Sequence, residues 1–496
     1  MVKRRKPVPG WLEYEVEEKM NEAKFWFQVW HSSNKPQHGD LYQNMRISRR
    51  NFKAAKRRCL NAEESIKREK FVEACINGDK DMFEELKKLK GRANSCTTKI
   101  DGKNKPDEIA DRFKEIYSEL YNRTGSTEPM DDLLKEVNDK ISDEDLDMVD
   151  KVTGELVEHI LKQKIKNGKS DPEFDITTDS LKNAPKELHE ILAKFLRASL
   201  IHGYISHSLL LCAIVPLVKK KNGKLDDSDN YRGIGLSCII LKIFDWILLI
   251  LFDKELSTDL NQFGFQEESS CAMLSWTVLE VLNSFSRSGS QIYGCLLDYR
   301  KAFDFINHRK MFENLRGRKM NLLFLRLLMF IYIYQKCYVR WNNTRSYSFD
   351  VTNGTRQGSI FSPKGGFATT LDPMLEELRG SGHGCSLGIH YYGALAWADD
   401  VILLNTSVQG LQSMVDICQK HATENDLMFS TDPDPKLSKI VCIAFNCKNK
   451  DSLGDIILNG NPLPWKDSVK HIGTTLHSNG TMEQDCREQR AIFIQN

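Results

Sequence analysis

The sequence contains no Cys-x-x-Cys pair, although it holds 13 cysteines. Their number is odd and they are scattered singly, which argues against a disulfide framework and against the usual spacing of zinc ligands. The basic cluster Lys3-Arg-Arg-Lys6 does not begin a secretory signal, because Pro7, Pro9 and Glu13 follow where an apolar segment is needed. We therefore expect a protein of a reducing, intracellular compartment that is not secreted.

A strong net charge and a clean membrane-spanning run are also missing. The formal net charge of +2 does not by itself indicate a nucleic-acid partner. The apolar run from Gly233 to Phe252 is long enough to span a bilayer, but Lys242 and Asp245 near its middle each cost about 2.5–3.5 kcal/mol on insertion. We expect a core helix of a soluble domain there, with a transmembrane helix as the alternative.

The composition is that of a globular protein. With 496 residues and 41% hydrophobic content, two to four domains with sizeable cores are expected. Residues 1–95 have strong helix formers, no Pro after Pro36 and most of the clustered Lys and Arg, which predicts a basic helical leader. The stretch Arg49–Arg58 is interpreted either as a helix lying along a phosphate backbone or as a solvated helix face.

Two adjacent carboxylates, Asp399 and Asp400, interrupt the apolar run 394–404. Burying ionised carboxylates costs several kcal/mol, so this pair needs either solvent at a turn or a cation. One interpretation is a β-hairpin with an exposed tip. The other is a hairpin that holds Mg²⁺, which takes oxygen ligands and in phosphate chemistry is often held in pairs. Asp298, at the end of the apolar strand 292–297, would supply the second carboxylate, with a helix N-cap as its alternative role.

Three further segments carry candidate phosphate contacts. An apolar strand at 209–218 ends in a basic turn with Lys219 and Lys220, which predicts either a phosphate grip or an ordinary hairpin tip. Arg232 is interpreted as a fork for phosphate or as a structural ion-pair partner. A polar, Gly-bearing loop at 353–363 precedes a predicted helix.

In order, the chain has a strand ending in Asp298, a helix, a Gln-Gly loop at Gln357-Gly358, and the Asp399-Asp400 hairpin. This set resembles a reverse transcriptase, specifically the polymerase of non-LTR (LINE-type) retrotransposons, over nearly the whole chain. The resemblance implies an α+β fold with the fingers and palm of a right-hand polymerase, an antiparallel palm sheet, and a preceding all-helical leader. The implied divisions are 1–95 leader, 96–140 linker and helices, 141–290 fingers and start of palm, 291–480 palm, and 481–496 truncated start of thumb.

The resemblance implies roles at individual positions. Asp298 and Asp399 match the family's metal ligands, and Asp400 is their near neighbour. Phe303, five residues after Asp298, matches the aromatic steric gate whose ring occupies the place of a ribose 2′-hydroxyl. Lys439 matches a Lys proposed to protonate pyrophosphate.

Nucleotide contacts are implied in the same way. Arg232, within Asn230-Tyr-Arg232, is similar to the fingers Arg that holds the triphosphate, and Lys219 or Lys220 would assist it. Gln357 and Gly358 resemble the loop that braces the incoming nucleotide and the template.

The turn His471-Ile472-Gly473 resembles the family's primer grip, and Gln262-Phe-Gly-Phe265 is similar to its usual Gln-Phe-Gly-Phe segment. The chain departs from the family at Lys364-Gly365-Gly366, where one extra residue and two glycines predict a late or displaced helix. It departs again at Glu267-Glu268, where a basic, Gly-bearing stretch is usual. These departures weaken the expected nucleotide and template contacts.

The implied function is RNA-directed DNA polymerisation by two-metal nucleotidyl transfer from a dNTP to a primer 3′-hydroxyl. It would use two Mg²⁺ ions, an RNA template and a DNA primer in the nucleus and cytoplasm, with no membrane and no organic cofactor. The alternative is a catalytically impaired remnant that only binds nucleic acid. The family's endonuclease would precede residue 1 and its thumb would follow Asn496, so we expect part of a longer polyprotein and weak, distributive synthesis.

Overall fold

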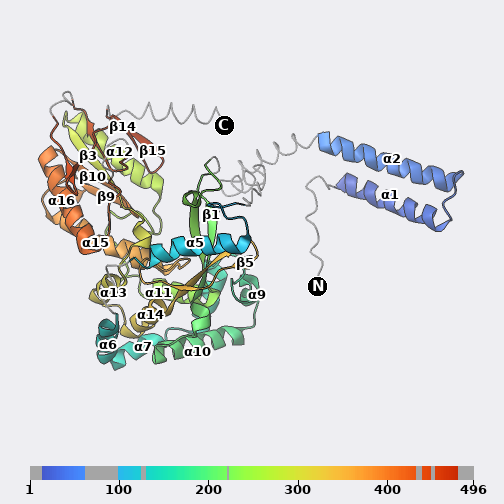
Figure 1. Ribbon diagram of the computed structural model, residues 1–496, viewed down its shortest axis with the longest axis horizontal. Coiled ribbons are helices and arrows are strands. Elements are labelled where there is room, and N and C mark those ends of the chain that lie inside the picture. The colour runs from blue at the N-terminus through green and yellow to red at the C-terminus, as the bar shows by residue number, and fades with distance from the viewer. Residues whose placement is uncertain are drawn as a thin grey trace. The chain divides into compact units, whose positions relative to one another are not determined.

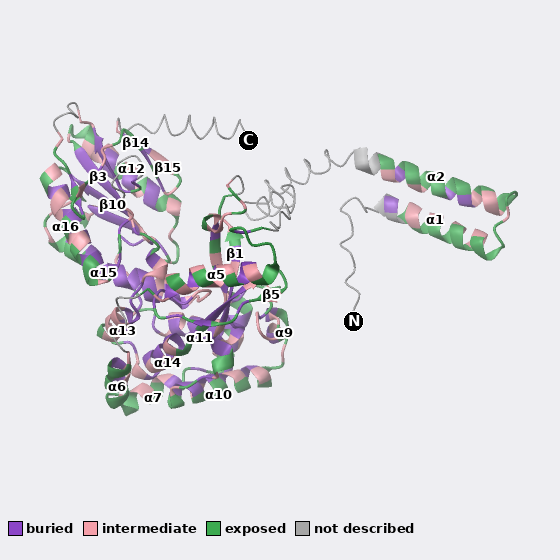
Figure 2. Cartoon of the chain, viewed as in Figure 1, coloured by how far each residue is buried: buried purple, intermediate pink, exposed green. Residues whose placement is uncertain are grey.

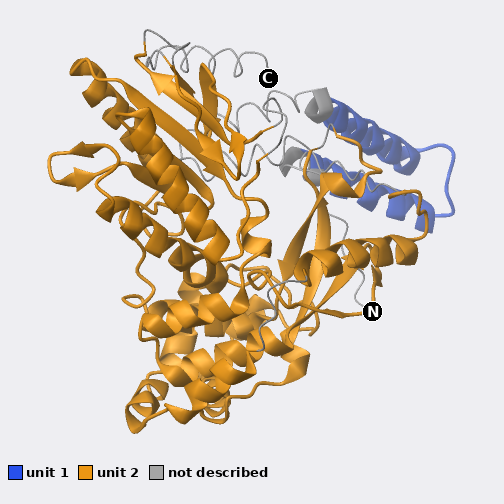
Figure 3. Ribbon diagram, turned by 60° about the vertical axis from the view of Figure 1, so that its left-hand side comes forward, with its two compact units in different colours: residues 1–96 blue, residues 97–496 orange. Residues whose placement is uncertain are grey.

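The computed structural model describes residues 14–61, 99–123, 130–220, 223–431, 438–447 and 453–478. The chain divides into two compact units, residues 1–96 and 97–496 (Figure 3). Every strand within the described ranges belongs to the second unit. The expected boundaries near residues 140, 290 and 480 stay predictions.

The described part of the first unit is a helical hairpin of α1 (Tyr14–Ser32) and α2 (Asp40–Asn61) (Figure 1). Val16, Met45 and Ala55 are buried between the helices, and an acidic residue in the first turn of α2 favours its start through the helix dipole. The described Lys and Arg side chains of α2 are exposed or half-buried. The rest of the predicted leader, residues 1–13 and 62–95, lies outside the described residues.

Helices make up much of the second unit and begin at residues that favour helix starts. Pro106 occupies the first turn of α5, where its missing N–H costs nothing, and Ser270, Asn307 and Ser407 cap the helices that follow them. The helices are α5 (Pro106–Tyr121), α6 (Asp131–Asp139), α7 (Asp143–Val149), α8 (Gly154–His159), α9 (Thr178–Lys182), α10 (Lys186–His202), α11 (Ile239–Leu251), α12 (Cys271–Arg287), α13 (His308–Gly317), α14 (Leu322–Tyr334), α15 (Thr369–Gly380) and α16 (Val408–Glu424).

A five-stranded sheet has the order β2-β1-β4-β5, with β6 also paired to β4. Helix α5 packs on this sheet through Phe113 and Tyr117, which share a core with Tyr231 and Trp341. The β1–β2 pair is antiparallel and the β1–β4 pair is parallel. The strands are β1 (Leu211–Val218), β2 (Tyr231–Leu236), β4 (Lys336–Trp341), β5 (Thr344–Arg345) and β6 (Phe349–Asp350).

A four-stranded sheet of order β11-β3-β10-β9 is antiparallel throughout, which confirms the predicted palm sheet. Its strands are buried on both faces (Figure 2). On one face Leu371 of α15 and Leu411 of α16 share the main core, and on the other Leu274 and Val278 of α12 pack. The strands are β3 (Ile292–Asp298), β9 (Ala394–Trp397), β10 (Asp400–Asn405) and β11 (Val441–Phe445).

Three short hairpins are also present in the described part of the second unit. They are β7 (Ser386–Leu387) with β8 (His390–Tyr391), β12 (Ile457–Leu458) with β13 (Asn461–Pro462), and β14 (Ser468–His471) with β15 (Thr474–His477).

The apolar run that begins at Gly233 forms the end of β2 and then α11, whose Ile243 and Phe244 are fully buried. Its central carboxylate, Asp245, is buried and forms an ion pair with Arg356, and it accepts hydrogen bonds from Ser359 Oγ at 2.9 Å and Ile360 N at 2.8 Å. Within the described ranges, no helix has the length and apolar character needed to cross a membrane.

The helix after the Gln-Gly loop differs from the expected late start. Residues Ser362–Ala368 form a π-helical segment that continues directly into α15, because a wider turn absorbs an extra residue without breaking the helix. A Cβ on Gly365 would lie 2.3 Å from the Phe361 ring, and one on Gly366 would lie 3.3 Å from Met311 Sδ. The glycines therefore permit close packing of the π-helical segment. The expected late start is not seen, because the helical segment begins at Ser362, whereas displacement of this helix stays a prediction.

Candidate active site

Three carboxylates meet at one end of the four-stranded sheet. Asp298 is the last residue of β3 and Asp400 the first residue of β10, and the two are direct antiparallel partners. Asp399 precedes Asp400 in the two-residue turn between β9 and β10. The helix after β3 begins at His308 and is capped by Asn307, so the alternative role of Asp298 as its N-cap is not seen.

Burial and mutual repulsion shape the electrostatics of this group. Burial, followed by the charges of Asp399 and Asp298, raises the pKa of Asp400 to about 6. Burial is also the main cause that raises the pKa of Asp399, with the charge of Asp298 adding to it. Bringing a cation to this group would relieve the repulsion, because nearby positive charge favours ionised carboxylates.

The residues present fit a divalent cation. Asp298 Oδ2 is buried and accepts no hydrogen bond, although the Lys439 ammonium lies 3.5 Å away as an ion-pair partner. No cluster of three or more His, Cys, Asp or Glu side chains in the described part of the chain is arranged to hold a metal ion. Mg²⁺ nevertheless needs only one or two carboxylates when substrate phosphates and water complete its coordination. Asp298 and Asp399 meet that smaller requirement.

Phe303 follows β3 in a 3₁₀ turn, Ala302–Asp304. Its half-buried ring lies 4.4 Å, between centroids, from the ring of Phe367 in the π-helical segment, and 6.0 Å from the ring of Phe265 in an edge-on arrangement. Contact with these two rings limits rotation of the Phe303 side chain. The π-helical segment thus supports the ring predicted to be the steric gate.

The Gln-Gly loop is tied to the same segment. Gln357 Nε2 donates to Asp304 Oδ1 at 3.2 Å, Asn353 Nδ2 donates to the Asp304 carbonyl at 2.7 Å, and Thr355 N donates to the Phe303 carbonyl at 2.6 Å. Burial raises the pKa of Asp304 against a lowering contribution from Tyr121. Sequence reasoning did not identify Asp304 as the partner of Gln357, because neither residue type specifies the other.

The loop also rests closely on β2. A Cβ on Gly235 would lie 2.4 Å from Gln357 Cβ, and one on Gly358, at φ +74°, would lie 2.6 Å from the Gly235 carbonyl oxygen. Ser237 Oγ donates to the Gly358 carbonyl at 2.9 Å. Glycine is therefore required at both positions for the loop to reach β2.

Positive charge approaches from the β1–β2 hairpin. Arg232 is exposed on β2, and its charge lowers the pKa of both Asp399 and Asp304. Lys219 also lowers the pKa of Asp304, while its Nζ donates to the Asp229 carbonyl at 2.8 Å. Lys220 is exposed, and its backbone N donates to Asn230 Oδ1 at 3.0 Å. The structure thus brings Arg232 toward the acidic group and Lys219 toward Asp304, whereas Lys220 is seen only in contact with its own hairpin.

The predicted primer grip is the turn of the β14–β15 hairpin. Ile472 and Gly473 both have positive φ, +45° and +84°. Burial lowers the pKa of His471 to about 4, and neither of its ring nitrogens is hydrogen-bonded. The hairpin lies on the α12 side of the four-stranded sheet, where Val469 and Leu476 join the α12 core.

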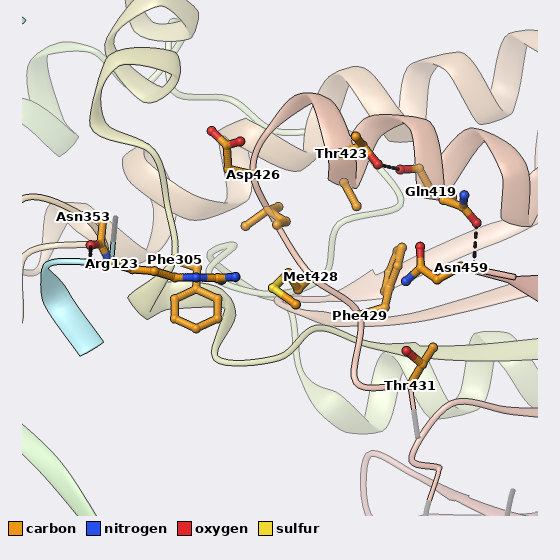
Figure 4. A pocket seen from close by; sticks show the side chains of 12 residues that line it. Arg123, Phe305, Asn353, Gln419, Thr423, Asp426, Met428, Phe429, Thr431 and Asn459 are labelled. Carbon is orange, nitrogen blue, oxygen red and sulfur yellow. Dashed lines mark hydrogen bonds between the residues drawn. The ribbon is translucent and has the colours of Figure 1, made fainter. Parts of the chain in front are cut away.

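A separate cavity of about 470 Å³ lies beside the segment that follows Asp298 (Figure 4). At one edge of the cavity, the Arg123 guanidinium lies 4.7 Å from the centre of the Phe305 ring. Met428 on another edge accepts a backbone hydrogen bond from Arg300 N at 2.7 Å, and Ser430 N donates to the Asp298 carbonyl at 2.8 Å. None of the predicted site residues lines this cavity, so it is distinct from the acidic group.

Comparison with known proteins identifies the family of this chain. Residues 218–476, more than half of the chain, match the family model described as reverse transcriptase (RNA-dependent DNA polymerase). The chain is similar to the retrovirus-related Pol polyproteins of the type-1 retrotransposable element R2 of Nasonia vitripennis, with 26% identity over 46% of this chain, and of the type-2 element R2DM of Drosophila melanogaster, with 26% identity over 49%. It spans 22% of the length of each of these relatives. The expected family is thereby confirmed, and the chain belongs to the reverse transcriptases, within which it is related to the polymerases of non-LTR retrotransposons.

Proposed function

We propose that this chain catalyses RNA-directed DNA synthesis, with Asp298 and Asp399 as its metal-binding carboxylates. The observation that carries the proposal is the register of β3 with β10, which brings three acidic residues to one sheet end. Arg232 and Lys439 act on the charge of that same group. Acidic residues flanked by cations suit a reaction in which phosphate charge must be held and neutralised.

In the proposed reaction the primer 3′-hydroxyl gives up its proton to water and its oxygen bonds to the α-phosphorus of a dNTP. The bond from that phosphorus to the β-phosphate oxygen breaks, which releases pyrophosphate. When bound, two Mg²⁺ ions supply charge neutralisation at the attacking oxygen and at the leaving pyrophosphate. Arg232 and Lys219 hold the triphosphate, and Lys439 donates a proton to pyrophosphate as it leaves. Lys439 Nζ is largely exposed, 3.5 Å from Asp298 Oδ2, where an arriving nucleotide can compete for it.

The remaining site residues position the substrates. The Phe303 ring occupies the place of a ribose 2′-hydroxyl and so excludes it. Contact with Phe367 keeps the ring in that position. Gln357, fixed by Asp304, braces the nucleotide beside the template, and Gly358 permits that arrangement. The His471-Ile472-Gly473 turn holds the primer end.

Primer extension tests the proposal directly. The full chain is given a poly(A) template, an oligo(dT) primer, dTTP and Mg²⁺, and we expect extension that Asp298→Ala and Asp399→Ala each abolish. Matched binding measurements on the same primer-template separate loss of chemistry from loss of nucleic-acid binding. Extension that survives either substitution would refute the assignment of the carboxylates.

The second candidate, a remnant that only binds nucleic acid, is favoured by the conformation of Glu268. This residue stands where the family usually has a Gly-bearing stretch, and it occupies the left-handed region at φ +63°, a conformation that suits Gly and strains a side chain. Binding of the primer-template without extension in the assay above would support this candidate.

A further inference from the structure

The tip of the β9–β10 hairpin, which carries Asp399, has a conformation that its own sequence disfavours. Ala398, directly before Asp399, lies at φ +56°, a region that L-residues with a Cβ rarely occupy. A hairpin of this kind ordinarily has Gly at the first turn position. Such a conformation persists only where the surroundings determine it, so some contact must hold Ala398.

One side chain contacts both peptide groups of Ala398. Gln262 Oε1 accepts from Ala398 N at 2.9 Å, and Gln262 Nε2 donates toward the Ala398 carbonyl oxygen at 3.4 Å. The same Oε1 also accepts from Gly264 N at 2.9 Å. Because Gln262 is only 1% exposed, water does not compete for these bonds.

The segment that carries Gln262 is itself fixed to the sheet. Phe263 N donates to the Ala396 carbonyl, and Ala396 N donates to the Asn261 carbonyl, both at 2.8 Å. Gln262 and Ala396 thus form a parallel bridge at the edge of β9. Asp259 anchors the start of this segment through an ion pair with Arg379 at 2.6 Å.

Gly264 completes the arrangement by its small size. A Cβ at this position would lie 2.4 Å from Ala398 N and 2.9 Å from Gln262 Oε1. Any side chain would therefore separate the segment from the hairpin tip. The segment Asn261–Gly264 consequently makes close backbone contact with Ala398, the residue that precedes Asp399.

We propose that Gln262 is a positioning residue that fixes the peptide between Ala398 and Asp399 and so aims the Asp399 carboxylate at Asp298. This role rests on the proposed function, in which Asp399 holds metal. It requires an acceptor and a donor on one planar group, which a Gln amide supplies. Glu lacks the donor, and Met has similar length but lacks both.

The first test does not depend on catalysis. Amide hydrogen exchange is measured on the full chain for the parent, for Gln262→Met and for Gln266→Met. Gln266 is the matched control, because its side chain bonds to Thr258 rather than to the hairpin. We expect exchange at Ala398 to rise about tenfold in Gln262→Met only, the order of effect of losing one buried hydrogen bond, with β3 unchanged.

The second test measures single-nucleotide addition. Gln262→Met should lower kcat by about ten- to a hundredfold, since displacement of a reacting group by about 1 Å costs that much, and it should raise the Mg²⁺ concentration for half-maximal rate. KM for dTTP should change little. Adding Ala398→Gly to Gln262→Met should recover part of the rate, because Gly adopts positive φ without support. A merely structural Gln262 would lower the melting temperature without these changes.

Each outcome decides the proposal. Unchanged exchange at Ala398 in Gln262→Met overturns it, even if the parent chain is an active polymerase. A parent that extends no primer refutes the proposed function, whereas raised exchange confined to Ala398 would still establish that Gln262 fixes the hairpin tip. If Gln262→Met does not fold, Gly264→Ala replaces it, since its Cβ presses on Ala398 N and should raise exchange at the same amide. Normal exchange in Gly264→Ala would then overturn the proposal.

Discussion

Asp304 Oδ1 accepts a hydrogen bond from Gln357 Nε2 at 3.2 Å, which ties the Ala302–Asp304 turn to the Gln-Gly loop. We expect Asp304→Ala to release Gln357 and to raise KM for dTTP about tenfold, the order of one lost hydrogen bond to a charged group. Steady-state primer extension checks this, and thermal unfolding measures the accompanying loss of stability. Asp304→Asn keeps an acceptor and should stay near the parent; an equal defect in both variants would mean that the charge matters instead.

Removal of the Phe303 ring should relax sugar selection. The ring packs against Phe367 at 4.4 Å, so Phe303→Ala opens space where a 2′-hydroxyl could fit. Incorporation of UTP relative to dTTP should rise about tenfold or more, because the steric exclusion is removed. Phe303→Tyr keeps the ring and should discriminate like the parent. An unchanged ratio in Phe303→Ala would show that the gate lies elsewhere.

Glu268 offers a test of backbone strain outside the catalytic group. At φ +63° a glycine is free of the Cβ clash, so Glu268→Gly should stabilise the protein by about 1 kcal/mol. Urea denaturation measures this gain. The neighbouring Glu267, which has no positive φ, provides the control: Glu267→Gly should lower stability, since it adds freedom to the unfolded chain and removes the exposed ion pair with Lys164.

His308 should make stability dependent on pH. Burial lowers its pKa to about 4, from about 6.5 in an unfolded chain, and its Nε2 contacts the Gly354 carbonyl at 2.7 Å. Below pH 6.5 the unfolded state binds the proton and the folded state does not, so stability is complete above pH 6.5 and falls as the pH approaches 4. At pH 5 the loss should be about 2 kcal/mol.

The pH effect of His308 is isolated by comparison with His308→Gln, because other titrating groups are common to both proteins. The difference in unfolding free energy between parent and variant should shrink by that amount from pH 7 to pH 5. A constant difference would show that the pKa of His308 is the same in the folded and unfolded states.

The basic helix α2 should contribute affinity without chemistry. Its described Arg49, Arg50, Lys53 and Arg57 side chains are exposed, so replacing these four by Gln should weaken RNA binding. The slope of log affinity against log salt should fall by about 0.7–0.9 for each lost phosphate contact. Exchanging Arg for Lys, and Lys for Arg, at the same positions preserves charge and should preserve the slope. An unchanged slope in the neutral variant would favour a solvated helix face.

Several features could be predicted from the chain alone because their signals are local. An apolar strand ending in Asp298 and an apolar hairpin with Asp399 and Asp400 at its turn indicate both the sheet and the carboxylates. Buried strands require apolar residues, and charged residues collect where such strands end. The antiparallel palm sheet and the family were predicted correctly on these residues.

The tertiary structure decided the contacts between segments that are distant in sequence. Gln262 and Ala398 are 136 residues apart, and Gln357 and Asp304 are 53 apart, so no local pattern could pair them. The π-helical segment Ser362–Ala368 was likewise mispredicted as a late helix start. Helix propensity penalises glycine, but it does not account for the Phe361 ring, which occupies the space beside Gly365. The local sequence thus determined which carboxylates lie at the end of the sheet, because buried strands end where charged residues begin. Packing between distant segments determined how those carboxylates are held.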